Sequence, residues 1–183
     1  NFLKLINEKY SNERFSTLHL NGRNLEDLEA DSFDFIAVYS VLHHIPDYLN
    51  AITELARVCK PGGIIYIDHE LNDEYYSGRP IYKEFKSKAL RINWRKYFVF
   101  ANYVGRIRRL FNSRYSNEGD IHVWPDDRIE FQRIEENLKK QGFEVVVSKN
   151  YLHYDRLYRP EVYKEYEELC SDIRLMVFHK SLA

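Results

Sequence analysis

Two adjacent histidines offer the clearest acid–base chemistry in this sequence. His43 and His44 follow the apolar run FDFIAVY, residues 33–39. Imidazole titrates near neutral pH, so His44 could act as a general base that takes the proton of a hydroxyl nucleophile. The alternative for both rings is structural, because a histidine at the end of a buried strand can also hold a loop by hydrogen bonds.

A second polar cluster closes the next apolar run, GIIYIDHE (63–70). Asp68, His69 and Glu70 stand at its end and could supply a base, a substrate clamp or neither. We assign His69 and Glu70 to substrate binding. A metal held by His69, Glu70 and His44 would lack the pattern of a fourth ligand, so no metal is predicted.

The elements that carry these clusters indicate an α/β fold. Residues 33–39 and 63–70 are almost wholly apolar, which is typical of strands buried on both faces of a parallel sheet. Between them, residues 46–63 place apolar side chains at helical spacing before Pro61 and Gly62, which end a helix. A strand, helix, strand unit of this size predicts a right-handed parallel crossover.

The remaining patterns extend this unit to a Rossmann-like, mostly parallel sheet with flanking helices and an antiparallel last strand. Alternation and helical periodicity distinguish the expected strands from the expected helices. The expected elements are a helix at 2–10, a strand at 15–20, helices at 128–143 and 160–172, and strands at 144–154 and 173–180.

Residues 71–125 interrupt the alternation and are expected to be a helical, basic insertion that forms a lid or a substrate-binding cap. Between Arg79 and Arg114 there are eleven lysines and arginines and one acid, Glu84, a local charge of +10. The charge has three interpretations: a solvated lid face, a site for an anionic substrate, or contact of segment 79–114 with an acidic membrane surface. Nucleic acid is disfavoured, since no recognition module accompanies the charge.

Composition limits the class of protein further. The 183 residues carry a formal net charge of -1, and two well-separated cysteines, Cys59 and Cys170, show no metal-site or disulfide-scaffold spacing. No apolar run reaches the roughly 18 residues of a membrane-spanning helix. We therefore expect one cytoplasmic domain, 1–183. Because the sequence starts at Asn1, partway through a helical pattern, we also expect it to be N-terminally incomplete.

The segment DSFDFIAVYSVLHHIPD (31–47), followed by ITELARVCKPGG (52–63), resembles the central motifs of class I S-adenosylmethionine-dependent methyltransferases that act on small molecules. In that family an acidic residue precedes the strand, a histidine-proline-aspartate stretch follows it, and a lysine-proline-glycine-glycine turn leads into the next strand. The resemblance covers residues 1–70 well and 127–180 in the order of elements.

The resemblance implies S-adenosylmethionine as cofactor and assigns roles at the strand end. Ligands of open α/β sheets bind outside the carboxyl ends of the strands. By resemblance, Tyr39, Ser40 and Val41 line the methionine and ribose side of the cofactor, His43 belongs to the same cofactor-binding segment, and His44 faces the methyl-transfer centre.

Four other assignments also come from the resemblance. Asn21 and Gly22 stand where the family contacts adenine, often with an aspartate that is replaced here by Asn21. His122 and Trp124 stand where members often place substrate-facing residues, and the alternative for Trp124 is a buried loop anchor. The glycine-rich loop and the ribose-binding acid of the family are not found in this sequence, in line with N-terminal truncation.

The resulting functional prediction is methyl transfer from S-adenosylmethionine to an oxygen or nitrogen of a small metabolite, which could be anionic or linked to a lipid or sugar. The alternative is a non-catalytic methyltransferase-like scaffold that holds a partner through its basic insertion. An intact glycine-rich loop upstream would favour the enzyme.

Overall fold

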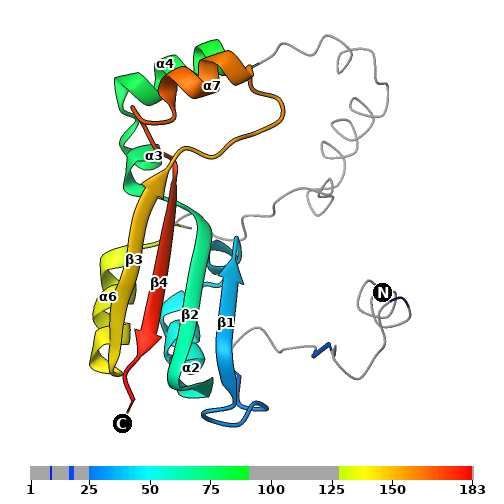
Figure 1. The fold of residues 1–183 in the computed structure, drawn as a ribbon, viewed down its shortest axis with the longest axis vertical. Coiled ribbons are helices and arrows are strands. Elements are labelled where there is room, and N and C mark those ends of the chain that lie inside the picture. The colour runs from blue at the N-terminus through cyan, green and yellow to red at the C-terminus, as the bar shows by residue number, and fades with distance from the viewer. Residues whose placement is uncertain (1–8, 10–16, 19–24, 91–127, 183) are drawn as a thin grey trace, which may run out of the picture.

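Four strands form the sheet on which the described part of the chain is built (Figure 1). The computed structural model describes residues 9, 17–18, 25–90 and 128–182. The strands are β1 (Phe33–Tyr39), β2 (Cys59–Leu71), β3 (Phe143–Tyr151) and β4 (Ile173–Lys180). They lie in the order β1-β2-β4-β3.

The strand directions confirm the predicted α/β, Rossmann-like sheet. β1 and β2 pair in parallel, with Tyr39 opposite Asp68. β4 runs antiparallel to both of its neighbours, β2 and β3, as predicted for the last strand. β1, β2 and β3 therefore point the same way, and their carboxyl ends meet at one edge of the sheet (Figure 1).

Helices α2 (Tyr48–Val58) and α6 (Phe131–Lys140) pack side by side on one face of the sheet (Figure 1). α2 begins where the Asp47 side chain accepts the N–H of Asn50 at 3.2 Å, which satisfies one of the unpaired donors of the first turn. The apolar stripes of both helices close the main core. Its fully buried members include Ile52, Ala56, Ile65, Ile67, Ile134, Leu138, Met176 and Phe178.

The junction between α2 and β2 differs from the predicted one. We expected the helix pattern to run to Lys60 and end at Pro61 and Gly62, but α2 ends at Val58. Cys59, which has no exposed surface, already pairs with Phe33, and the pairing resumes only at Phe35 and Ile64. α2 therefore ends two residues earlier than predicted, where Cys59 joins the sheet, and the lysine-proline-glycine-glycine stretch bulges from the strand.

A cap lies beyond the carboxyl ends of β1, β2 and β3 (Figure 1). It consists of α3 (Asp73–Ser77), α4 (Pro80–Ala89), α7 (Pro160–Tyr166) and the segments that join α7 to β3 and β4. A second core holds it together. Its buried members are Tyr82, Phe85, Ala89, Leu152, Tyr158, Tyr166 and Cys170.

The cap corrects the prediction for residues 160–172. We expected one helix there, flanking the sheet as β3 leads to β4, but α7 stops at Tyr166 and packs against α4. Contacts between aromatic rings hold α7 against α4. The ring of Phe85, in α4, contacts the rings of Tyr158 and Tyr166, with centroids 5.1 and 5.8 Å apart. The cap is thus built from two segments far apart in sequence.

Several predicted elements lie outside the described residues. These are the helix at 2–10 except Lys9, and residues 91–127, which hold most of the basic segment 79–114. Of the strand expected at 15–20 only Thr17 and Leu18 are described, and these two residues lie in no strand.

Gly63 provides a test of the α2–β2 junction. A Cβ atom there would lie 2.8 Å from the carbonyl oxygen of Lys60 and 2.7 Å from the Cys59 sulfur. Since the backbone must move to relieve this overlap, we expect Gly63→Ala to lower the free energy of unfolding by about 1–3 kcal/mol in urea titrations. Gln132→Ala, on the exposed face of α6, is the control and should change it by less than about 0.5 kcal/mol. Equal stability of the two variants would contradict the close packing at Gly63.

Candidate active site at the carboxyl edge of the sheet

The ends of β1 and β2 form two neighbouring bends. The N–H of Ser40 donates to the carbonyl oxygen of Asp68 at 3.0 Å, which joins the strands at their last rung. Beyond this rung Ser40 has φ of 52° and His69 has φ of 65°, the left-handed region that side chains rarely occupy. Such conformations persist only where the surroundings fix them, and they concentrate at functional sites.

A bulge in β2 explains where its polar end residues point. Ile67 pairs with Met176 and Glu70 pairs with Arg174, so β2 has one more residue than β4 between these two pairs. A bulge re-aims the side chains that follow it. As a result Glu70 turns into the protein, with no exposed surface, whereas His69 is only partly buried.

The buried Glu70 carboxylate organises the segment after β1. Its Oε1 accepts the backbone N–H groups of Val41 and Leu42 at 2.8 and 2.7 Å. Its Oε2 lies 2.7 Å from Nδ1 of His43. Leu42, 1% exposed, inserts into the main core and anchors the same 3-10 turn, Leu42–His44. The histidine turn is therefore held by both apolar packing and a buried charge.

His69 lies in an aromatic stack. Its ring stacks on Tyr39, with centroids 4.7 Å apart, and meets the ring of His153 edge-on at 4.4 Å. The Tyr39 hydroxyl lies 3.1 Å from Nδ1 of His69. Burial, assisted by the nearby His153, lowers the pKa of His69. At neutral pH the ring is thus uncharged and can exchange a proton with a bound molecule.

Asp68 fixes the base of this stack. It accepts the hydroxyls of Tyr66 at 2.6 Å and Tyr151 at 2.8 Å, and the backbone N–H of His69 at 2.7 Å. The hydrogen bond to Asp68 raises the pKa of Tyr66 to about 12. Burial raises the pKa of Tyr151 as well, so both phenols remain protonated donors, and Asp68 links the ends of β2 and β3.

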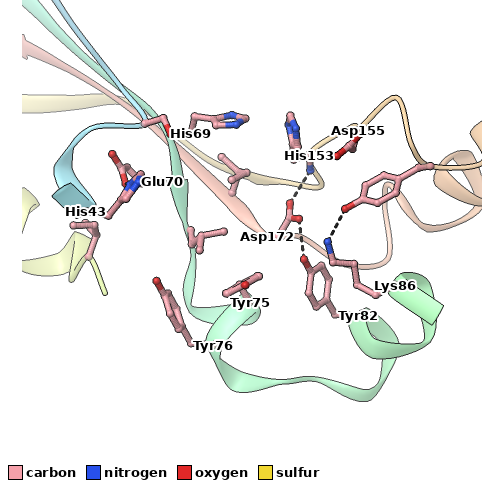
Figure 2. A pocket seen from close by; sticks show the side chains of 15 residues that line it. His43, His69, Glu70, Tyr75, Tyr76, Tyr82, Lys86, His153, Asp155 and Asp172 are labelled. Atoms are coloured by element: carbon pink, nitrogen blue, oxygen red, sulfur yellow. Dashed lines mark hydrogen bonds and ion pairs between the residues drawn. The ribbon is translucent and has the colours of Figure 1, made fainter. Parts of the chain in front are cut away.

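The cap is tied to the sheet by a second buried acid, Asp172. Its carboxylate accepts the Tyr82 hydroxyl of α4 at 3.0 Å and the backbone N–H of His153 at 2.7 Å (Figure 2). The side chain of Asn72, 1% exposed, donates to Ser171 Oγ at 2.8 Å. These bonds place Tyr82 and His153 on opposite sides of one carboxylate.

Lys86 is the cation on the cap side. Its ammonium donates to the Tyr158 hydroxyl at 2.6 Å and lies 5.1 Å from the centre of that ring and 5.6 Å from that of Tyr82 (Figure 2). The contact with Tyr158 is thus a hydrogen bond at the edge of the ring, whereas the Tyr82 ring can stabilise the ammonium through its negative quadrupole. The positive charge is therefore held at the wall by two phenol rings.

A cavity of about 360 Å³ separates the strand ends from the cap (Figure 2). Imidazole and phenol groups dominate its wall, together with Lys86 and a few acids and aliphatic side chains. The lining residues are Ser40, His43, His69, Glu70, Leu71, Tyr75, Tyr76, Tyr82, Lys86, Ile129, His153, Asp155, Tyr158, Asp172 and Ile173. This size and this mixture of apolar and polar groups suit a small organic ligand.

The structure brings several predicted site residues together. Ser40, His43, His69 and Glu70 line the cavity, and Tyr39 borders it through its stack on His69. The other predicted residues have three different placements. His44 lies beside His43, with ring centroids 4.0 Å apart, but does not line the cavity. Val41 is 39% exposed, and its backbone N–H donates to Glu70. The remaining four lie outside the described residues: Asn21, Gly22, His122 and Trp124.

The residues that sequence reasoning missed come from the cap. Tyr82, Lys86, Tyr158 and Asp172 line the cavity and stand at the end of no predicted strand, whereas His153 stands at the end of the strand predicted at 144–154. That position was one usable signal. The other was the polar pair Ser171 and Asp172, directly before an apolar strand, because a polar residue buried at a strand start needs partners.

The described residues contain neither a cluster of metal-ligating side chains nor a membrane-spanning helix. Within residues 9, 17–18, 25–90 and 128–182, no group of three or more histidine, cysteine, aspartate or glutamate side chains is placed to hold a metal ion. In the same residues no helix has the length and apolar character needed to cross a membrane.

Comparison with curated proteins relates the first part of the chain to methyltransferases. The family described as "Methyltransferase domain" matches residues 1–67. Demethylmenaquinone methyltransferase of Halalkalibacterium halodurans is 37% identical over 65 residues, 34% of this chain and 26% of that protein. The protein of the same name from Bacillus subtilis is 31% identical over 84 residues, 45% of this chain and 36% of the relative.

A longer match reaches the second half of the chain. Demethylmenaquinone methyltransferase of Oceanobacillus iheyensis is 24% identical over 153 residues, 82% of this chain and 58% of that protein. The chain thus spans between about a quarter and three fifths of the length of these relatives.

Solved structures share the fold. A putative S-adenosylmethionine-dependent methyltransferase from Listeria monocytogenes matches 98% of this chain and 75% of its own, with a TM-score of 0.54 and 14% identity. One from Mesorhizobium loti matches 96% and 75%, with a TM-score of 0.52 and 17% identity. The cyclase SpnF, with a TM-score of 0.54 and 15% identity over 99% of this chain and 62% of its own, has the same fold, so fold alone does not determine the reaction.

These findings confirm the resemblance to class I S-adenosylmethionine-dependent methyltransferases. Residues 1–67 match the family described as "Methyltransferase domain", and the described residues share the fold of the solved structures named above.

His69 provides a pH test of the site. Because its pKa is lowered from the ordinary value of 6.5, the unfolded chain takes up a proton that the folded chain resists as the pH falls. The stability that His69 contributes is therefore present above pH 6.5 and is lost below it. Between pH 7.5 and 5.5, we expect wild type to lose more unfolding free energy in urea titrations than His69→Gln does. An equal loss in both proteins would contradict a buried, neutral His69.

Proposed function

We propose that the chain is the acceptor-binding part of an S-adenosylmethionine-dependent methyltransferase, with the methyl acceptor bound in the cavity between the strand ends and the cap. The observation that carries this proposal is the position of the cavity. It opens at the carboxyl ends of β1 and β2, where ligands of open α/β sheets bind, and is bordered by the segment Tyr39–Val41 that the resemblance assigns to the cofactor.

The residues described on the cofactor side fit that assignment. Tyr39 is 58% exposed and Val41 is 39% exposed, and between them Ser40 lines the cavity, so apolar surface and a hydroxyl face the place where the cofactor would lie. S-adenosylmethionine would supply an electrophilic methyl group there. The protein's own contribution is to orient the acceptor and exclude water.

We further propose that the acceptor is a hydroxylated aromatic or quinone-type ring. Imidazole and phenol rings on both sides of the cavity offer flat contact surfaces, and the Lys86 ammonium can bind a ring oxygen or its anion. The curated relatives named demethylmenaquinone methyltransferase support this class, since that name denotes methylation of a quinone carbon. A ring carbon is thus added to the oxygen and nitrogen acceptors predicted from sequence.

The cap extends the predicted role of the insertion. Residues 73–90 supply Tyr75, Tyr76, Tyr82 and Lys86 to the cavity wall, as a substrate-binding cap would. The membrane contact predicted for segment 79–114 stays a prediction, because most of that segment lies outside the described residues. So does the role of His44 as general base, which His44→Ala would test by a loss of turnover.

The proposed function is tested with the protein in the longest form that its gene encodes. Calorimetry should show binding of S-adenosylmethionine and of its demethylated product. Methyl-labelled cofactor should then transfer label to 1,4-dihydroxynaphthalene. Absence of cofactor binding would overturn the methyltransferase, and cofactor binding without transfer to 1,4-dihydroxynaphthalene or catechol would overturn the acceptor class.

Lys86 and Lys88 form a matched pair for the acceptor side. Both are on α4, but Lys86 lines the cavity, whereas Lys88 pairs with Glu84 and Tyr166 outside it. Because a hydrogen bond to a charged group contributes about 1.5 kcal/mol, Lys86→Met should raise KM for 1,4-dihydroxynaphthalene roughly tenfold with cofactor affinity unchanged. Lys88→Met should leave KM within about twofold of wild type. Similar KM values for both variants would contradict acceptor binding at Lys86.

A further inference from the structure

We propose that the cavity selects an acceptor ring with two oxygens, which bind Nε2 of His69 on the sheet side and the Lys86 ammonium on the cap side. Tyr39 is the positioning residue that fixes His69 as a hydrogen-bond donor. This inference rests on the proposed function and makes its acceptor class more specific. It also gives Tyr39, which the resemblance assigns to the cofactor, a second role.

The two nitrogens of the His69 ring have different surroundings. Nδ1 lies 3.1 Å from the Tyr39 hydroxyl. Nε2 has no hydrogen-bond partner in the described part of the chain, yet it is not a buried atom, whereas Nε2 of His43 is buried. Because His69 lines the cavity, a molecule bound there can reach its Nε2 and not that of His43.

The hydrogen bond to Tyr39 determines which nitrogen of His69 carries the hydrogen. Burial, assisted by the nearby His153, lowers the pKa of His69, so the ring is uncharged at neutral pH and only one nitrogen is protonated. A phenol is a stronger acid than a neutral imidazole, and the Tyr39 hydroxyl has no second hydrogen-bond partner among the residues described. Its O–H therefore donates to Nδ1, and Nε2 carries the hydrogen and is the donor.

Neighbouring groups hold this donor in place. The His69 ring stacks on Tyr39 with an angle of 15° between the two planes and meets His153 edge-on. The backbone N–H of His69 is bound to the Asp68 carboxylate at 2.7 Å. Pre-organisation of this kind favours binding, because a ring that is already oriented loses little further freedom when a ligand arrives.

The cap supplies the second donor. Lys86 lies on α4, across the cavity from His69 (Figure 2). An ammonium has three N–H donors, and the Tyr158 hydroxyl accepts one of them. The charged Lys86 suits an oxygen with negative charge, and the N–H of His69 suits a neutral one. A ring with a single oxygen leaves one donor unpaired, which costs binding free energy, so rings with two oxygens are preferred.

Substrate preference tests the two contacts. 1,4-Dihydroxynaphthalene and 1-naphthol share a ring system and differ by one oxygen. His69→Phe keeps the aromatic stack and removes the donor, so we expect kcat/KM to fall roughly fivefold for 1,4-dihydroxynaphthalene and less than about twofold for 1-naphthol. His69→Gln, whose amide retains a donor, should keep part of the preference for two oxygens.

Lys86→Met is the contrasting variant. It should lower kcat/KM for both substrates by similar factors, because the single oxygen of 1-naphthol binds the stronger, charged donor. Comparing the two substrates within each variant cancels the difference in their intrinsic reactivity. A change in preference therefore reports the contact with His69 and not a general loss of structure.

Nitrogen-15 NMR tests the role of Tyr39. At neutral pH, wild-type His69 should be protonated at Nε2, and addition of 1,4-dihydroxynaphthalene should shift the Nε2 signal. Tyr39→Phe should shift the Nδ1 signal, because this nitrogen loses its donor, and should weaken the preference for two oxygens. Tyr154→Phe, which removes an exposed phenol outside the cavity, is the control and should leave the His69 signals and both kcat/KM values unchanged.

The outcomes separate this inference from the proposed function. Wild-type His69 protonated at Nδ1, or equal losses for both substrates in His69→Phe, would overturn the donor role and leave the methyltransferase in place. If His69→Phe does not fold, an unchanged substrate preference in Tyr39→Phe has the same meaning. A wild-type protein that binds no S-adenosylmethionine would overturn the proposed function, and with it both contacts, whatever the tautomer of His69.

Discussion

A carboxylate without exposed surface has lost its hydration shell, and Glu70 replaces those lost contacts with three donors from the segment that follows β1. Removing the partners of a buried charge costs about 3–5 kcal/mol, so the end of β2 and the turn after β1 cannot easily separate. The one-residue bulge between Ile67 and Glu70 makes this possible, because it turns the carboxylate inward. The floor of the cavity depends on this arrangement.

The opposite wall depends on a different kind of cohesion. The cap has its own apolar core, in which Phe85 packs among tyrosines of α4, α7 and the segment between β3 and α7. Its link to the sheet is polar and runs through Asn72 and Asp172, which join the segments that enter and leave it. Two cores joined by buried hydrogen bonds leave a space between them, and that space is the cavity.

The two walls also divide the chemistry. The sheet side carries two imidazoles, His43 and His69, each within hydrogen-bond distance of a neighbouring strand-end residue. The cap side carries phenols and Lys86, which can hold a ring and its oxygens. Methyl transfer needs the acceptor to be positioned more than it needs strong acids or bases. A cap wall of phenols and an ammonium, opposite a sheet wall of imidazoles, suits the proposed binding of an acceptor.

The sequence by itself determined where β1 and β4 lie: residues 33–39 and 173–180 are strands with the predicted bounds, because apolar runs and alternation are local patterns. It also placed histidines and acids at the strand ends, and the methyltransferase resemblance rests on residues 31–63, which include His43 and His44. The place of α7, the inward turn of Glu70 and the meeting of Tyr82 with Asp172 were decided only by the tertiary structure. Their partners lie up to 90 residues apart in sequence, and no local pattern encodes which side chains a strand order and a bulge will bring together.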